Sequence, residues 1–275
     1  MEFDWRRKAI IPSSREIHVW CFSLDGSPAP DLDACIQESE RVRAARFAFA
    51  RDRTRFLRAR YVLRQLLGQY LGAQPQELSI QTNEHGKPFL ADAYGLSFNL
   101  SHSGSCGMLA IGNGFQVGVD VEEQRTPTDI GELAKSVFSE EELSAIDGLS
   151  IGELGKPFLT CWTRKEAYLK ALGVGLIVDP RSVSVGMEPT LRRVTVRTGL
   201  VESFVDVMTI IPEGRYVASI AAVGGFSGCR VFELDDTGAA CTEEGAHVDR
   251  HLARCLEHKC LESLANARVS FFPCA

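Results

Sequence analysis

The sequence lacks a segment that could cross a membrane as a helix, because no run of about 18 apolar residues occurs in its 275 positions. It also lacks a secretory leader: Arg6, Arg7 and Lys8 are followed by no apolar segment, so we expect no signal peptide. Apolar residues make up 45% of the chain and charged residues 24%, a balance typical of globular proteins. This composition excludes a wholly disordered chain, a collagen and a coiled coil.

Several familiar motifs are missing as well. The nine cysteines are irregularly spaced and include no C-x-x-C pair, which argues against a zinc ribbon and a disulfide framework. We therefore expect reduced thiols and a cytoplasmic protein. The glycine-rich loops of P-loop nucleotide-binding proteins and of dinucleotide-binding folds are both absent, so neither chemistry has support.

Positive charge is concentrated in one segment. Between Arg41 and Arg64 there are nine arginines and a single acid, Asp52, although the whole chain has a net charge of −6. The segment is either a solvated helical surface or a site for a polyanion. The acidic remainder of the chain argues against a broad nucleic-acid-binding surface, and a compact polyphosphate such as a nucleotide or coenzyme fits better.

Periodicity and capping residues predict two successive sets of strands, each with one long helix. In the first set the helix covers 53–71 and ends at Gly72, and we expect strands at 16–24, 78–82, 97–101 and 108–111. In the second set the helix begins near Pro157 and runs to Leu172, and we expect strands at 116–122, 182–185, 194–197, 204–211 and 216–222. We predict an α+β fold of two similar, pseudo-twofold-related halves, 1–115 and 116–225, followed by an extension over 226–275 with a helix at 247–264.

Two acids on one predicted strand are the first candidates for chemistry. Asp120 and Glu122 alternate with valines in Gly118-Val119-Asp120-Val121-Glu122, so both carboxylates point to the same side. Neighbouring carboxylates repel each other unless a cation lies between them, and Mg²⁺ is a hard cation that binds such oxygens. The alternative is a half-exposed strand with two solvated acids.

Glu166 and Lys170 form a second candidate pair, because residues four apart share one face of a helix. They suit a third carboxylate for the cation and a lysine that holds a phosphate, although a simple exposed ion pair fits the same spacing.

The run Ser101-His102-Ser103 is a third candidate. Adjacent strand residues face opposite sides, so Ser101 cannot easily use His102 as its base. Phosphate binding by a histidine and a serine hydroxyl, or a structural histidine beside a turn, both remain open. Lys87 in Gly86-Lys87-Pro88 is a weaker candidate for anion binding.

Four motifs in this order resemble the two-domain 4′-phosphopantetheinyl transferases of the surfactin type: Gly86–Pro88, Phe98–Gly104, Gly118–Glu122 and Trp162–Gly173. The resemblance runs from Arg41 to Ala222. It implies transfer of 4′-phosphopantetheine from coenzyme A, the co-substrate, to a serine of an apo acyl or peptidyl carrier protein. The carrier proteins would serve polyketide, nonribosomal peptide or fatty acid synthesis.

The resemblance also implies a role for each candidate residue. Asp120, Glu122 and Glu166 would hold Mg²⁺ (or Mn²⁺), and Lys170 would neutralise the pyrophosphate as a catalytic residue. Glu166 would be the general base, a role that the family divides between this glutamate and a metal-bound water. Contacts with coenzyme A, mainly around its 3′-phosphate, would come from Arg43, Lys87, Ser101, His102 and Lys170.

Two other functions are weighed against this one. A catalytically silent module that binds coenzyme A or a carrier protein would not need the complete carboxylate set. A nucleic-acid-binding protein built on residues 41–64 would leave that set unexplained. We expect a monomer with no nucleic-acid or membrane partner.

Overall fold

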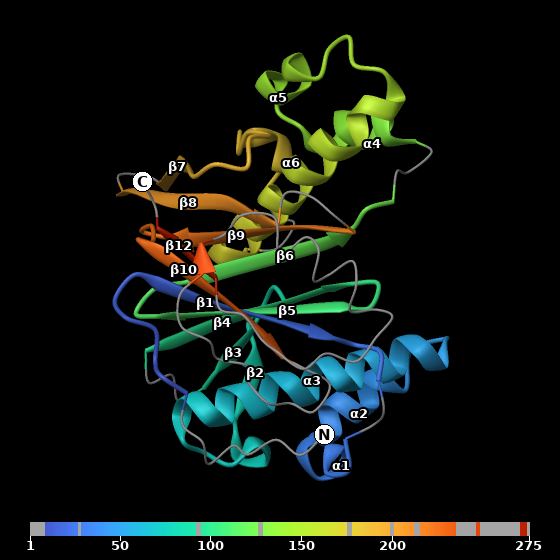
Figure 1. The fold of residues 1–275 in the computed structure, drawn as a ribbon, viewed down its shortest axis with the longest axis vertical. Coiled ribbons are helices and arrows are strands. Elements are labelled where there is room, and N and C mark those ends of the chain that lie inside the picture. Colours follow the sequence, from blue (N-terminus) through green and yellow to red (C-terminus); the bar gives the residue numbers. More distant parts are fainter. Residues whose placement is uncertain are drawn as a thin grey trace.

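Four layers of secondary structure stack in the computed structural model: a helix, two β-sheets face to face, and a second helix (Figure 1). The helix α3 (Ala50–Leu71) covers the outer face of one sheet, and α6 (Ile151–Leu172) covers the outer face of the other. Both helices have 22 residues, and each ends at a glycine in the left-handed conformation, Gly72 and Gly173. The predicted α+β fold with two sheet-containing halves is therefore confirmed. The structure describes residues 9–26, 29–91, 95–125, 129–174, 178–198, 201–211, 215–234, 246–247 and 270–273.

The first sheet has six strands in the order β11-β12-β10-β1-β5-β4. They are β1 (Glu16–Ser23), β4 (Leu96–Ser103), β5 (Cys106–Asn113), β10 (Gly228–Leu234), β11 (Ala246–His247) and β12 (Ser270–Pro273). β10 pairs in parallel with β1, so residues 228–234 are part of this sheet, although the sequence analysis counts them with an extension. The helix predicted at 247–264 lies outside the described residues, apart from the strand residue 247.

The second sheet is antiparallel throughout, in the order β6-β9-β8-β7. Its strands are β6 (Val117–Glu123), β7 (Arg192–Thr198), β8 (Val201–Ile211) and β9 (Tyr216–Val223). The smaller elements are α1 (Leu32–Cys35), α2 (Glu38–Ala44), α4 (Ile130–Val137), α5 (Glu140–Ala145), the hairpin of β2 (Ile80–Thr82) and β3 (Pro88–Leu90), and two 3₁₀ turns at Pro75–Glu77 and Pro180–Ser182. No helix among the described residues has both the length and the apolar character needed to span a bilayer.

Alternation along the strands divides the apolar side chains between the layers. On β1, Trp20 and Phe22 pack against α3, whereas Val19 and Cys21 pack between the two sheets. On β6, Val119 and Val121 also face the space between the sheets. The opposite face of β6 is therefore turned toward α6.

Two local predictions differ from the structure. Residues 182–185 form no strand, because the carbonyl groups of Val183 and Val185 accept hydrogen bonds from buried side chains of α6 rather than from a neighbouring strand. Pro157 lies inside α6 and not in its first turn, since the helix already begins after Ser150, which forms a capping box with Glu153.

A buried histidine on β1 should make the stability of the fold sensitive to acid. Burial lowers the pKa of His18 to about 4 from an ordinary 6.5. Below pH 6.5 the unfolded chain therefore binds a proton that the folded protein does not, so stability is complete above pH 6.5 and falls as the pH drops toward 4. We expect His18→Gln to remove up to about 3 kcal/mol of this acid-induced loss, measured by denaturant unfolding at the two ends of this range. An equal loss of unfolding free energy in wild type and His18→Gln would contradict a role for His18 in this pH dependence.

Candidate functional site

The strand β6 and the helix α6 touch backbone to backbone at Gly118. A Cβ atom at this position would lie 2.0 Å from the carbonyl oxygen of Ala167 and 2.5 Å from the backbone nitrogen of Ala171. Gly118, Asp120 and Glu122 share one strand face, so the contact brings both carboxylates against the helix that carries Glu166 and Lys170.

Asp120 is a buried carboxylate with one oxygen engaged and the other free. Lys170 Nζ lies 2.5 Å from Asp120 Oδ1, and the Ser101 hydroxyl donates to the same oxygen at 2.9 Å. Asp120 Oδ2 is buried and has no hydrogen-bond partner among the described residues. Burial raises the pKa of Asp120, although the charge of Lys170 and the two hydrogen bonds act in the opposite direction.

Glu122 is also held by a serine of β4. The Ser103 hydroxyl donates to Glu122 Oε2 at 2.7 Å, and the Trp162 side chain provides a further hydrogen bond. Burial and the neighbouring charge of Asp120 raise the pKa of Glu122. Trp162 is thus half-buried beside the acidic cluster.

Glu166 completes the acidic cluster from the helix side. Burial raises its pKa, and the charges of Asp120 and Glu122 raise it further, while Lys170 lowers it. Within the described part of the chain, no hydrogen bond or ion pair engages its carboxylate. The three acids predicted from two distant motifs therefore meet in one place, and Lys170 is the cation beside them.

This cluster fits a hard cation, because it combines three oxygen-donor side chains with a buried, unpartnered carboxylate oxygen. The fit lies in the chemistry of these side chains and not in a preformed site: Asp120 Oδ1 is bound by Lys170, and the described residues contain no group of three His, Cys, Asp or Glu side chains already arranged around a metal position. The four residues His247, His251, Cys255 and His258, which would share one face of the predicted terminal helix, have side chains outside the described part of the structure.

A basic cluster lies on the other side of β4. His102 is exposed, whereas Ser101 before it is buried, as alternation requires. Partial removal from water lowers the pKa of His102, and the charges of Lys170, Arg60 and Arg43 lower it further. The guanidinium groups of Arg43 and Arg60 both lie over the ring of Phe56, at 5.3 and 5.4 Å. Four cationic or protonatable groups thus gather where an anion would be stabilised.

The arginine-rich segment does not act as one surface. Arg64 is fully buried and donates to Glu40 Oε2 at 2.9 Å and to two backbone carbonyl groups. Arg55 forms a two-pronged ion pair with Asp25. Five of the nine arginines are exposed: Arg41, Arg43, Arg46, Arg51 and Arg53. Arg60, which the sequence analysis does not single out, belongs to the basic cluster because it follows Phe56 by one helical turn.

Lys87 lies apart from both clusters and joins the two halves instead. Its ammonium group donates to Gln116 Oε1 at 3.2 Å and to the carbonyl oxygens of Val117 and Ala171 at 3.1 and 3.3 Å. Burial lowers the pKa of Lys87 to about 8. Its contacts fix the start of β6 against the end of α6.

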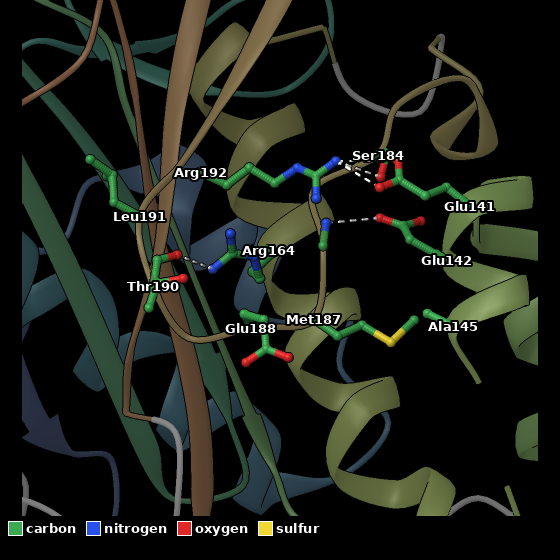
Figure 2. Close-up of a pocket in the computed structure, with 11 residues that line it drawn as sticks. Glu141, Glu142, Ala145, Arg164, Ser184, Met187, Glu188, Thr190, Leu191 and Arg192 are labelled. Atoms are coloured by element: carbon green, nitrogen blue, oxygen red, sulfur yellow. Dashed lines mark hydrogen bonds and ion pairs between the residues drawn. The ribbon is translucent and has the colours of Figure 1, made fainter.

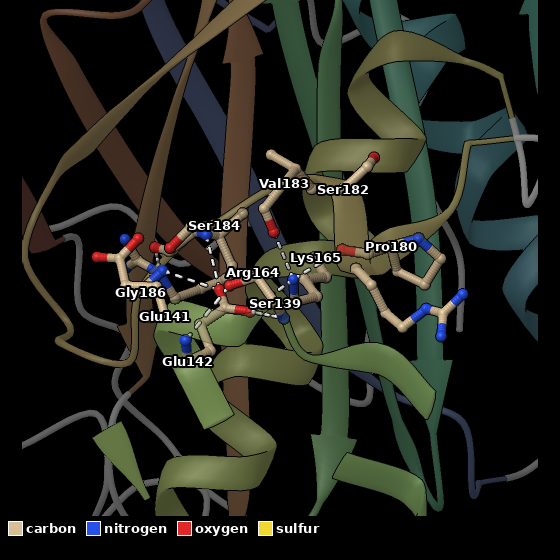
Figure 3. A network of polar contacts seen from close by, with 12 residues as sticks. Ser139, Glu141, Glu142, Arg164, Lys165, Pro180, Ser182, Val183, Ser184 and Gly186 are labelled. Atoms are coloured by element: carbon tan, nitrogen blue, oxygen red, sulfur yellow. Dashed lines mark hydrogen bonds and ion pairs between the residues drawn. The ribbon is translucent and has the colours of Figure 1, made fainter. Parts of the chain in front are cut away.

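A buried ion pair anchors α6 from the side that faces away from β6 (Figure 3). Lys165 Nζ lies 2.6 Å from Glu142 Oε2 and donates to the carbonyl groups of Pro180 and Val183. Burial alone would raise the pKa of Glu142, but the hydrogen bond from Lys165 and those from backbone N–H groups, with the charge of Lys165, hold it below its usual value. This network fixes the rotation of α6 and therefore the direction of Glu166.

A cavity of about 390 Å³ lies beside this network, between α5 and the loop at 184–192 (Figure 2). Both arginines that line it are already engaged: Arg192 binds Glu141, and Arg164 donates to the carbonyl oxygens of Val185 and Thr190. Elsewhere, Ser150 lies in Gly148-Leu149-Ser150-Ile151-Gly152, which fits the G-x-S-x-G pattern of serine hydrolases, but its hydroxyl donates to Glu153 at the start of α6. Neither feature supplies a second catalytic centre.

Comparisons with known proteins agree with the motifs. Residues 116–220 match the family model of the 4′-phosphopantetheinyl transferase superfamily, and residues 31–113 match a model described as "4′-phosphopantetheinyl transferase, N-terminal". The 4′-phosphopantetheinyl transferase HetI of Nostoc is 36% identical over 216 residues, which cover 77% of this chain and 89% of HetI. A phosphopantetheinyl transferase of Thraustochytrium is 33% identical over 58% of this chain and 62% of its own length. Among solved structures, Thermotoga maritima holo-[acyl-carrier-protein] synthase aligns over 44% of this chain and 70% of its own at a TM-score of 0.28 and 18% identity.

The backbone contact at Gly118 can be tested by adding one methyl group. Gly118→Ala should lower the free energy of unfolding by about 3 kcal/mol or more, because the methyl group would overlap the backbone of α6. Gly152→Ala, in α6 with no atom within 4 Å of the added Cβ, is the matched control and should be neutral or slightly stabilising. Denaturant unfolding of both variants measures the difference, and equal stabilities would argue against a close strand–helix contact.

Proposed function

Because this chain belongs to the 4′-phosphopantetheinyl transferase superfamily and is a transferase of that class, we propose that it transfers 4′-phosphopantetheine from coenzyme A to a serine hydroxyl of an apo acyl or peptidyl carrier protein. We further propose a cytoplasmic monomer. The free, buried thiols of Cys21, Cys35, Cys106, Cys161 and Cys229 suit a reducing compartment.

One observation carries the proposal: an acidic cluster and a basic cluster lie on either side of the end of β4, with Lys170 close to both. Lys170 is in contact with Asp120, and its charge also lowers the pKa of His102. Coenzyme A carries a 3′-phosphate and a pyrophosphate within one molecule, so it suits two neighbouring sites of this kind. Residues 1–115 would supply the basic contacts, and residues 116–225 the carboxylates.

Mg²⁺ (or Mn²⁺) fits the acidic cluster of Asp120, Glu122 and Glu166, and when bound it would supply positive charge that polarises the pyrophosphate. Arg43 and His102 would bind the 3′-phosphate, because they are the members of the basic cluster on its exposed side. Lys87 and Ser101 are weaker candidates for direct contacts, since their polar atoms are engaged by groups of the protein itself.

Transfer requires that the carrier-protein serine attack the phosphorus next to the pantetheine arm while the bond to the leaving 3′,5′-ADP breaks. Glu166 is suited to accept the proton of the serine hydroxyl, because its carboxylate is partly exposed and has a raised pKa. Lys170 would stabilise the negative charge that develops on the leaving phosphate.

Mass spectrometry of a carrier protein tests the proposal directly. An apo carrier protein incubated with this chain, coenzyme A and Mg²⁺ should gain one phosphopantetheine group, and omission of coenzyme A should prevent the gain. Glu166→Gln should abolish transfer with the fold intact, as judged by circular dichroism. Coenzyme A binding with no gain of mass on any of several apo carrier proteins would instead favour the catalytically silent module.

Lys170 can be tested separately from binding. Lys170→Ala should slow the chemical step by about 10²–10³-fold, because a positive charge next to the leaving phosphate is lost. Rapid-quench single-turnover measurements with saturating coenzyme A report this step. Unchanged single-turnover rates would show that Lys170 is only a structural partner of Asp120.

A further inference from the structure

The strands β4 and β6 belong to different sheets, yet polar side chains of β4 bind β6 at three successive points. Asn99 Oδ1 accepts a hydrogen bond from the backbone N–H of Val119 at 2.9 Å. Two residues on, Ser101 donates to Asp120, and two residues further Ser103 donates to Glu122. The spacing of two places all three side chains on one face of β4, so a single strand of the first half holds both carboxylates of the second.

The hydrogen-bonding roles of both hydroxyls are fixed by their other partners. Ser103 Oγ accepts from the backbone N–H of Glu123 at 3.1 Å, so its own proton is left for Glu122. Ser101 Oγ lies 3.2 Å from Lys170 Nζ, which can only donate, so its proton is left for Asp120. Each serine therefore fixes one oxygen of its carboxylate, and the buried Oδ2 of Asp120 remains without a partner among the described residues.

We propose that Ser101 and Ser103 are positioning residues, which set the carboxylates of Asp120 and Glu122 for a divalent cation. Hydrogen bonds to the ligands of a metal ion fix their orientation, and loss of one typically weakens binding about 10–100-fold. The cation site then depends on both halves, although all of its carboxylates come from the second. This inference rests on the proposed function for the cation, but not on the identity of the carrier protein.

The test measures binding of Mn²⁺ to the full chain by calorimetry, without carrier protein, both alone and with coenzyme A present. Ser103→Ala should bind Mn²⁺ about 10–100-fold more weakly than wild type, because Glu122 loses its fixed orientation. Ser103→Thr, which keeps the hydroxyl, should restore most of the affinity. Affinity for coenzyme A, measured without metal, should not change in either variant.

Ser97→Ala is the matched control. Ser97 lies on the same face of β4, but its hydroxyl donates to the carbonyl oxygen of Phe115 and touches no carboxylate. Its affinity for Mn²⁺ should equal that of wild type. If Ser103→Ala proves too unstable to measure, Ser103→Cys places a weak donor in a side chain of similar size and should show the same loss.

Ser101→Ala separates positioning from direct contact with coenzyme A. Positioning predicts weaker Mn²⁺ binding with an unchanged affinity for coenzyme A, whereas a contact with the coenzyme predicts the reverse, and the reverse would overturn the proposal for Ser101. Wild-type affinity for Mn²⁺ in Ser103→Ala would overturn it for Ser103 and leave the proposed function intact. A wild-type chain that binds no Mn²⁺ and modifies no carrier protein would instead contradict the proposed function itself.

Discussion

The site depends on how closely one strand approaches one helix. At Gly118 the backbones of β6 and α6 lie in contact, at a distance that leaves no room for a Cβ atom. This approach brings Lys170 Nζ within 2.5 Å of Asp120 Oδ1. It also places Glu166 close enough to Asp120 and Glu122 for their charges to raise its pKa. Two contacts hold the helix in that position. The Lys87 side chain binds a carbonyl group in the last turn of α6, and Lys165 of α6 forms a buried ion pair with Glu142. A loss of close packing here would separate the carboxylates of β6 from Glu166 and Lys170 on α6.

Side chains of β4 point alternately to its two faces, and this alternation separates the acidic groups of the site from the basic ones. Ser101 and Ser103 face the acids of the second half, and His102 between them faces the arginines of α2 and α3. Burial raises the pKa of all three acids, so the cluster is poorly compensated by Lys170 alone and suits a further positive charge. The opposite cluster, with its lowered pKa at His102, suits a negative one. A ligand that carries several phosphates beside a cation satisfies both.

The sequence predicts features set by neighbouring residues, such as periodicity along one helix or strand. It does not predict contacts between side chains of different sheets. The shared face of Asp120 and Glu122 and the end of α3 at Leu71 follow from the sequence pattern and agree with the structure, whereas α3 begins three residues before the predicted start. The hydrogen bond from Ser103 to Glu122 is not predictable from local sequence, because its partner lies on a strand of another sheet, although polar residues do alternate at 97, 99, 101 and 103. The contacts of Lys87 cannot be predicted locally, because the three oxygen atoms near its ammonium group come from distant parts of the chain. The same limit explains the strand expected at 182–185, whose carbonyl groups bind side chains of α6.

The position of β10 has a consequence for biosynthesis. β1 ends at Ser23, but one of its two neighbours, β10, begins only at Gly228 and ends at Leu234. Until that residue is synthesised, one edge of β1 is an unpaired row of backbone N–H and C=O groups, which invites association with other nascent chains. The second sheet, by contrast, is complete once β9 has emerged. The strands that complete the first sheet are therefore synthesised after every strand of the second.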